Sequence, residues 1–181
     1  MGTFFALLPE DPAREVLSAF ARPAIDGVRW EPLERLHVTI RYFASIPSDL
    51  RAATITAGVA CASAQPSPTI VLGPTTERLG RDGTLVVPAA GATPVAAALD
   101  VALKDAGLEG ELEPRGEDFY GHLTVARQRR GATTPDALLA QPLATSFVAR
   151  ELVLIDSVPT SDGRRYEVLA RAPFGATDGA G

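Results

Sequence analysis

The chain contains only two histidines, and both stand in the same short pattern. His37 begins the segment His-Val-Thr-Ile, and His122 begins the segment His-Leu-Thr-Val. Residues i and i+2 of a β-strand point to the same face, so each segment presents an imidazole beside the hydroxyl of Thr39 or Thr124. An imidazole has an ordinary pKa of about 6.5. Both histidines are therefore candidates for moving protons near neutral pH.

Two imidazoles and two hydroxyls in one cleft would suit in-line attack on a phosphodiester. One neutral imidazole would accept a proton from the attacking water, and the other, as imidazolium, would protonate the leaving ribose oxygen. The hydroxyls would donate hydrogen bonds to the non-bridging phosphoryl oxygens. This scheme uses neither a metal nor a cofactor, and the sequence contains no H-x-x-x-H, no D-x-D and no glycine-rich phosphate loop. We therefore expect no metal and no cofactor.

Three neighbouring residues are further candidates for binding the substrate. Arg41 follows His37 by four residues, so a regular strand places both side chains on one face, where the guanidinium would contact the phosphate. Arg127 follows His122 by five, an offset that points to the opposite face, so it reaches the histidine only through an irregularity or from the strand end. Tyr42 is a candidate for stacking on a base, although packing is the more frequent role of such a ring.

The alternative to a functional pair is that each histidine is an ordinary strand residue. A single histidine on a half-apolar strand more often finds hydrogen-bond partners in the core or at an edge than a substrate. Threonine is also a good strand former in its own right. The duplication of the whole pattern around His37 and His122 favours the functional interpretation.

The surrounding pattern of apolar residues and breaks predicts an α+β protein made of two similar halves. Each half runs strand, helix, strand with the histidine, helix, strand. The expected strands are 3–8, 36–43, 69–73, 84–87, 121–127, 147–155 and 165–171, and the expected helices are 11–23, 48–62, 93–106 and 135–140. We expect one bilobal domain over residues 1–174, with repeat halves of roughly 1–80 and 81–174, and a flexible tail over 175–181.

The composition of the chain excludes several classes of protein. The chain has 181 residues, 46% of them hydrophobic, and a net charge of −5, which argues against a protein that wraps long nucleic acid. No apolar run reaches the roughly 20 residues that cross a bilayer, and the N-terminus lacks the pattern of a signal peptide. The lone Cys61 excludes an intramolecular disulfide. We expect a cytoplasmic monomer without membrane contact.

The sequence resembles the two-histidine (2H) phosphoesterases, and most closely the bacterial RNA 2′,3′-cyclic phosphodiesterases, also called 2′-5′ RNA ligases. The two H-x-T-x motifs carry this resemblance. The opening FFALLPED, the run W-x-P-x-x-x-L-H-x-T from Trp30 to Thr39, and the extension H-x-T-x-x-R to Arg127 agree with that branch. The ending is similar too, through Ser157, Gly163 and Tyr166. Gly121, where the family often has proline, and Arg41 depart from it.

The resemblance implies a pseudo-symmetric, two-lobed α+β fold with mainly antiparallel sheets flanked by helices around a central cleft. It implies that His37 and His122 are the acid and the base, with His37 favoured as the acid, and that Thr39 and Thr124 bind phosphate. The implied activity is hydrolysis of 2′,3′-cyclic phosphate RNA ends or nucleotides to the 2′-phosphate. Weak 2′-5′ RNA ligation would be the reverse reaction.

Three other functions stay open at the level of the sequence. A 2H hydrolase could act on a small cyclic phosphate such as ADP-ribose 1″,2″-cyclic phosphate, which the negative net charge favours. A nucleotide-binding module could use the same cleft without catalysis. A structural protein could carry the two motifs by chance.

Overall fold

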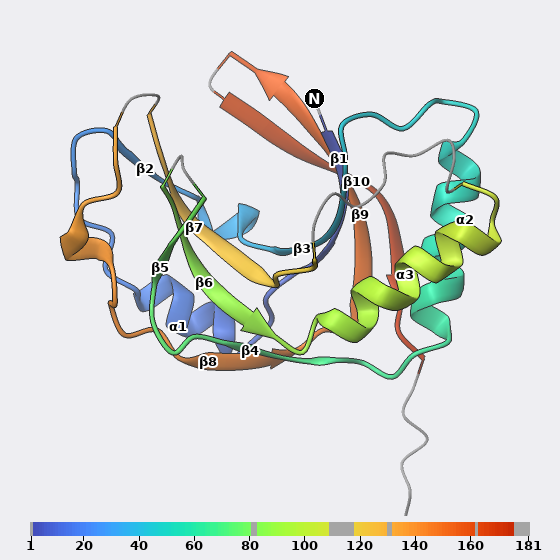
Figure 1. The fold of residues 1–181 in the computed structure, drawn as a ribbon, viewed down its shortest axis with the longest axis horizontal. Coiled ribbons are helices and arrows are strands. Elements are labelled where there is room, and N and C mark those ends of the chain that lie inside the picture. The colour runs from blue at the N-terminus through green and yellow to red at the C-terminus, as the bar shows by residue number, and fades with distance from the viewer. Residues whose placement is uncertain (1, 81–82, 109–117, 130–131, 162, 176–181) are drawn as a thin grey trace, which may run out of the picture.

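The computed structural model describes residues 2–80, 83–108, 118–129, 132–161 and 163–175. Within these ranges the strands form one curled antiparallel sheet that is accompanied by helices (Figure 1), which confirms the α+β class. The strands are β1 (Gly2–Leu7), β2 (Val28–Trp30), β3 (Val38–Phe43), β4 (Thr69–Leu72), β5 (Glu77–Leu79), β6 (Thr84–Ala90), β7 (His122–Gln128), β8 (Thr145–Val148), β9 (Glu151–Thr160) and β10 (Gly163–Pro173).

The strand order divides the sheet into two lobes. It runs β10-β9-β1-β3-β7-β6-β4-β8, with β2 also pairing with β7 and β5 with β6. We call β10, β9, β1 and β3 the first lobe, and β7, β6, β4 and β8 the second lobe. The lobes join where β3 meets β7, at the antiparallel partners Val38 and Leu123. The two motif strands are therefore neighbours at the centre of the sheet.

Each lobe contains strands from both halves of the chain. β4 comes from the first half but pairs with β6 and β8 of the second lobe. β9 and β10 come from the second half, and β9 pairs with β1 of the first lobe. The repeat read along the sequence is thus interleaved in space, because the last strands of each half cross to the other lobe.

In the described part of the chain, three α-helices pack on the sheet, with bounds α1 (Ala13–Ala19), α2 (Arg51–Ser63) and α3 (Thr93–Asp105). α2 contacts β9 and β10, and α3 lies beside α2 and contacts β3 (Figure 1). α3 buries Val95, Leu99 and Leu103, which recur at steps of four, and it ends before Gly107, whose φ of 72° only glycine adopts at little cost. No helix of the described residues is both long and apolar enough to cross a membrane.

The first lobe has a buried strand at its centre. β1 is buried along its whole length, with Phe5 and Leu7 in the main core and Phe4 and Ala6 in a smaller cluster. Because successive side chains of a strand alternate between faces, the smaller cluster lies on the face opposite the main core. Phe4 thereby becomes part of the site described below.

Several expected boundaries were wrong. The helix expected from Ser48 begins at Arg51, because Pro47 to Leu50 form a turn in which the Leu50 amide bonds the Pro47 carbonyl at 3.1 Å. β6 continues through Pro88, which lies between the part of β6 that pairs with β5 (Thr84–Val86) and the part that pairs with β4 (Ala89 and Ala90), so its missing amide hydrogen interrupts neither ladder. The Pro88 carbonyl oxygen still accepts a bond from the amide of Gly73 at 3.0 Å.

Other differences concern the second half. The helix expected over 135–140 is a 3-10 turn, Asp136–Leu138, and a second such turn, Leu33–Arg35, precedes β3. The strand expected over 147–155 is divided between β8 and β9. Of the expected tail, residues 176–181 lie outside the described residues, whereas the amide of Gly175 bonds the Ala62 carbonyl at 3.2 Å.

Candidate active site

The two motifs meet across one pair of residues, Val38 and Leu123. Each of these lies between the histidine and the threonine of its motif, and both are fully buried in the core. Continuing the antiparallel register by one residue on each side places His37 opposite Thr124 and Thr39 opposite His122. All four polar side chains then lie on the face away from the core.

The two imidazoles have the same hydrogen-bonding arrangement. Nδ1 of His37 lies 2.6 Å from the carbonyl oxygen of Arg35, and Nδ1 of His122 lies 2.8 Å from that of Tyr120. Because a carbonyl oxygen only accepts, Nδ1 of each ring must carry the proton. Nε2 is therefore the nitrogen that each ring can use to accept or donate a proton.

His37 lies between two aromatic rings. It stacks on Phe4 with ring centroids 4.7 Å apart, and Tyr166 meets it edge-on at 5.5 Å. Burial lowers the pKa of His37 below its ordinary value, and repulsion from the Arg127 guanidinium and from His122 lowers it further. The register around Val38 and Leu123 places this imidazole and that of His122 on one face of two adjoining strands.

His122 is held in a comparable way from the second lobe. Its ring stacks on Tyr120 at 5.8 Å with an interplanar angle of 20°. The Tyr120 hydroxyl donates to the Glu77 carboxylate, and burial together with this bond raises the pKa of Tyr120 to about 12. Each histidine therefore has a backbone carbonyl on Nδ1 and an aromatic ring against its face.

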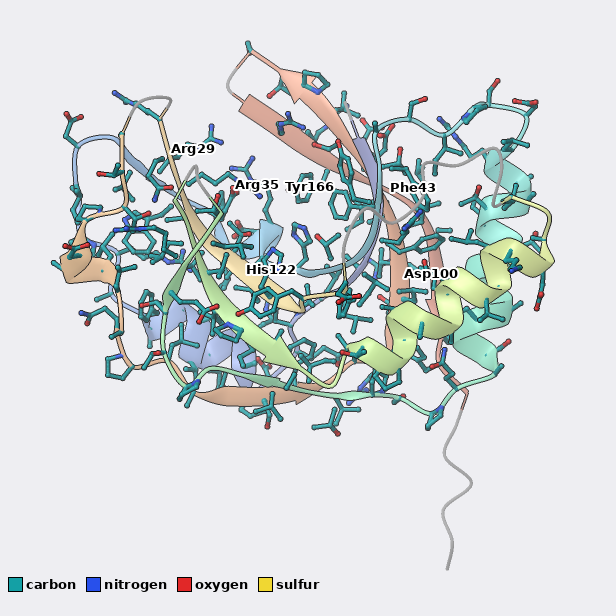
Figure 2. All side chains as sticks on the ribbon, viewed as in Figure 1. Arg29, Arg35, Phe43, Asp100, His122 and Tyr166 are labelled. Atoms are coloured by element: carbon teal, nitrogen blue, oxygen red, sulfur yellow. The ribbon has the colours of Figure 1, made fainter. Side chains whose placement is uncertain are left out.

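A cavity of about 350 Å³ opens beside His37 and Thr39. Its other lining residues are Phe4, Arg29, Glu31, Arg35, Tyr42, Arg127, Ser157, Arg164 and Tyr166. Figure 2 shows Arg35, Tyr166 and His122 on the same side of the sheet, with Arg29 farther out. His122 and Thr124 are not among the lining residues, but the strand register places them opposite Thr39 and His37, which are. Four arginines against one glutamate make the lining strongly positive, although the chain as a whole is acidic.

Arg127 reaches the cavity through a β-bulge. Thr124 pairs with Val86 and Ala126 with Leu85, so Val125 is an extra residue without a partner on β6. The bulge reverses the alternation of side chains and brings Arg127 to the face of His122. Its Nε donates to Oε1 of the buried Glu31 at 2.8 Å. The irregularity that the sequence required for Arg127 is therefore present.

Arg41 lies on the other face, so its expected position beside His37 was wrong. Thr39 pairs with Ala6 and Arg41 with Phe5, which leaves Ile40 as a bulge residue in β3. Arg41 is 7% exposed, lies 3.8 Å from the Asp100 carboxylate of α3, and packs over the ring of Phe43. Figure 2 shows Asp100 and Phe43 on the helix side of the sheet. Arg41 is a structural residue rather than part of the cavity.

The same bulge turns Tyr42 into the cavity. Tyr42 pairs with Phe4, which lines the cavity as well, and 53% of its surface is exposed. An exposed aromatic ring that lines a positive cavity can stack on a planar group of a ligand. The structure therefore brings together His37, Thr39, Tyr42 and Arg127, adjoined by His122 and Thr124, and leaves Arg41 out.

Four charged residues of the cavity were not predicted. Arg29 is in β2, Glu31 directly follows that strand, Arg35 ends the 3-10 turn, and Arg164 is in β10. The alternation of Arg29 and Glu31 around Trp30 was a signal for a half-exposed strand. Arg164 carries no such local signal, because only the pairing of β10 with β9 brings it to the site.

The described residues offer no evident metal centre. Among them, no three His, Cys, Asp or Glu side chains lie close enough together to hold a metal ion. The single cysteine, Cys61, is buried on α2 away from the site, and burial raises its pKa to about 11. The groups available for chemistry in the cavity are thus imidazole, hydroxyl, guanidinium and one carboxylate.

Comparison with solved structures identifies the fold of the chain. No family model matches the sequence, and no curated protein matches it either. Among solved structures, TT0787 of Thermus thermophilus matches with a TM-score of 0.80 and 19% identity over 98% of this chain and 100% of that chain. A structure described as a phosphoesterase matches with a TM-score of 0.72 and 21% identity, over 96% of this chain and 97% of the other.

Escherichia coli LigT, crystallised with 3′-AMP, matches with a TM-score of 0.72 and 19% identity over 95% of this chain and 97% of LigT. The chain has the LigT fold. The resemblance to the 2H phosphoesterases is thereby confirmed at the level of the fold, over nearly the whole chain.

Proposed function

We propose that this LigT-like chain is a metal-independent phosphodiesterase that opens 2′,3′-cyclic phosphates at RNA 3′ ends or on nucleotides and leaves a 2′-phosphate. The observation that carries the proposal is the meeting of the two motifs across Val38 and Leu123, with both imidazoles on one face. That LigT has been crystallised with 3′-AMP, ATP and NADP+ supports a nucleotide as the ligand. The positive cavity suits such an anion.

In the proposed reaction, Nε2 of His122 takes a proton from water as the water oxygen attacks phosphorus. The bond between phosphorus and the ribose 3′ oxygen breaks, and Nε2 of His37 donates a proton to that oxygen. Burial lowers the pKa of His37, which makes its imidazolium a stronger proton donor, and the negative phosphate favours that protonated form on binding. If the 5′-hydroxyl of an RNA replaces water as the nucleophile, the same steps form a P–O5′ bond and break the P–O3′ bond, which would be weak 2′-5′ ligation.

The remaining groups stabilise charge. The hydroxyls of Thr39 and Thr124 donate to the non-bridging oxygens, where negative charge develops in the transition state. The Arg127 guanidinium, oriented by Glu31, contributes a charge-assisted contact to the same oxygens. In this proposal residues 1–174 act as one bilobal unit, as a monomer and without a cofactor.

The decisive experiment is turnover of an oligonucleotide with a 2′,3′-cyclic end. His37→Ala and His122→Ala should each reduce the rate by about 10²–10⁴-fold, the usual contribution of one acid or base, while circular dichroism shows an intact fold. A p-nitrophenyl phosphodiester, whose leaving group departs without a proton, should be cleaved far better by His37→Ala than by His122→Ala. Near-native turnover by either variant on the cyclic end would refute the scheme, and tight binding without turnover would favour a nucleotide-binding module.

A second candidate substrate is a small cyclic phosphate such as ADP-ribose 1″,2″-cyclic phosphate. The LigT complex with NADP+, which contains a pyrophosphate, is the observation that favours it. Comparing kcat/KM for that compound with kcat/KM for a cyclic-ended oligonucleotide separates the two substrates.

A further inference from the structure

The four arginines of the cavity form two pairs. Arg127 and Arg29 are direct partners on β7 and β2, so their side chains share a face. Arg35 and Arg164 form the other pair, because Nη1 of Arg35 donates to the carbonyl oxygen of Arg164 at 2.9 Å. The Arg164 guanidinium is in turn held by the hydroxyl of Ser157 at 3.1 Å.

A buried carboxylate divides these pairs. Oε1 of Glu31 lies 2.8 Å from Nε of Arg127, and Oε2 lies 3.8 Å from Nε of Arg35. Glu31 is 7% exposed, and its amide is fixed to the carbonyl of Val125 at 2.9 Å. Two positive regions are therefore separated by one fixed negative group, rather than merged into a single site.

The two regions face different parts of the site. Arg127 is on the strand of His122 and close enough to lower the pKa of His37, so it belongs with the reacting phosphate. Arg35 and Arg164 line the cavity from the 3-10 turn before β3 and from β10, the edge strand of the first lobe. A cyclic phosphodiester carries one negative charge, and the pair Arg127 and Arg29 already supplies the positive charge that balances it.

Building on the proposed function, we propose that Arg35 and Arg164 form a second anion subsite, which binds a second phosphate of the same substrate. The substrate class is then a nucleotide with a cyclic phosphate on one ribose and a phosphate at its 5′ position, rather than a nucleoside cyclic phosphate. Guanidinium groups suit this task, because they present several donors to phosphate oxygens in a fixed plane.

The subsite is tested by binding, which does not depend on turnover. Calorimetry would compare adenosine 2′-monophosphate with adenosine 2′,5′-bisphosphate. The intact chain should bind the bisphosphate about tenfold or more tightly, the effect of one good charge-assisted contact. Arg164→Gln should bring this ratio close to one, and Arg164→Lys should keep part of it.

The matched control is Arg165→Gln. Arg165 is the next residue of β10, points to the opposite face, and pairs with Glu167 rather than lining the cavity. If attraction by the overall charge were the cause, Arg165→Gln would lower the ratio as much as Arg164→Gln. That result, or equal affinity of the intact chain for both ligands, would overturn the subsite.

Hydrolysis assays identify which kind of second phosphate the subsite binds. They also test the proposed function separately from the subsite. The intact chain should show a higher kcat/KM for 5′-phosphorylated adenosine 2′,3′-cyclic phosphate than for the form without the 5′-phosphate. A cyclic-ended dinucleotide and ADP-ribose 1″,2″-cyclic phosphate then show whether the phosphate is an internucleotide diester or a pyrophosphate. If no cyclic phosphate is hydrolysed while the bisphosphate preference holds, the proposed function fails and the subsite stands.

Discussion

Tyr42 and Arg127 occupy equivalent positions in the two motifs, five residues after their histidines. Each lies beyond a β-bulge, at Ile40 in β3 and at Val125 in β7, and each bulge residue follows its histidine by three. Without the bulges, an offset of five would place both side chains on the core face. The paired bulges thus add an aromatic ring from one lobe and a guanidinium from the other to the same cavity.

The first prediction uses the neighbours Arg41 and Tyr42, which lie on opposite faces of β3. Tyr42→Ala should raise the Kd for a nucleotide about tenfold or more, since stacking on a base contributes about 1–3 kcal/mol, and should leave the melting temperature unchanged. Arg41→Gln should lower the melting temperature, because it removes the contacts with Asp100 and Phe43, and should leave Kd unchanged. Calorimetry and thermal melts on both variants check this, and the opposite assignment of effects would contradict the described register.

The second prediction concerns Glu31. Glu31→Gln removes the carboxylate that orients Arg127 and reduces the negative charge beside the phosphate. The kcat should therefore fall by about tenfold, as expected from weakening one charge-assisted contact, while the 2′-phosphate product should bind more tightly. Steady-state kinetics with product inhibition measure both effects. Glu34→Gln, an exposed neighbour in the 3-10 turn, is the control and should change neither.

The third prediction follows from the lowered pKa of His37. Below pH about 6.5 the unfolded chain takes up a proton on this histidine more readily than the folded chain does. The free energy of unfolding should therefore fall as the pH drops below that value, and His37→Gln should reduce the fall. Urea denaturation at pH 7.5 and at pH 5.5, in a buffer without phosphate, tests this. An identical pH dependence in both proteins would show that burial does not disfavour the His37 cation.

The fourth prediction concerns metals. Dialysis against EDTA should leave the hydrolysis of a cyclic-ended oligonucleotide unchanged, because two imidazoles supply both proton transfers in the proposed reaction. Activity before and after dialysis, with and without added Mg²⁺, Mn²⁺ and Zn²⁺, is the measurement. Strong inhibition that one of these metals reverses would contradict the proposal.

The sequence predicted the fold class, the motif strands and the α3 helix well. These features depend on the local periodicity of apolar residues and on the proline and glycine residues that end helices and strands. The face of Arg41 was wrong for a tertiary reason. Alternation along β3 fails at Ile40, and the bulge there is defined by pairing with β1, which a strand's own sequence does not display. Glu31, Arg35 and Arg164 were missed for the same kind of reason. Glu31 follows β2, Arg35 ends a 3-10 turn and Arg164 lies in β10, and only the assembled sheet brings them together.

The interleaving of β4 with the second lobe, and of β9 and β10 with the first, has a consequence for how the site is maintained. A cut after residue 80 would leave His37 on a fragment without β9, one of the two strands that flank β1. It would leave His122 on a fragment without β4, the strand between β6 and β8. Neither fragment would be a self-sufficient module. The distance between the imidazoles of His37 and His122 is therefore fixed by strand pairs that combine segments from both halves of the chain. Separating the two imidazoles requires breaking hydrogen bonds between strands of the sheet.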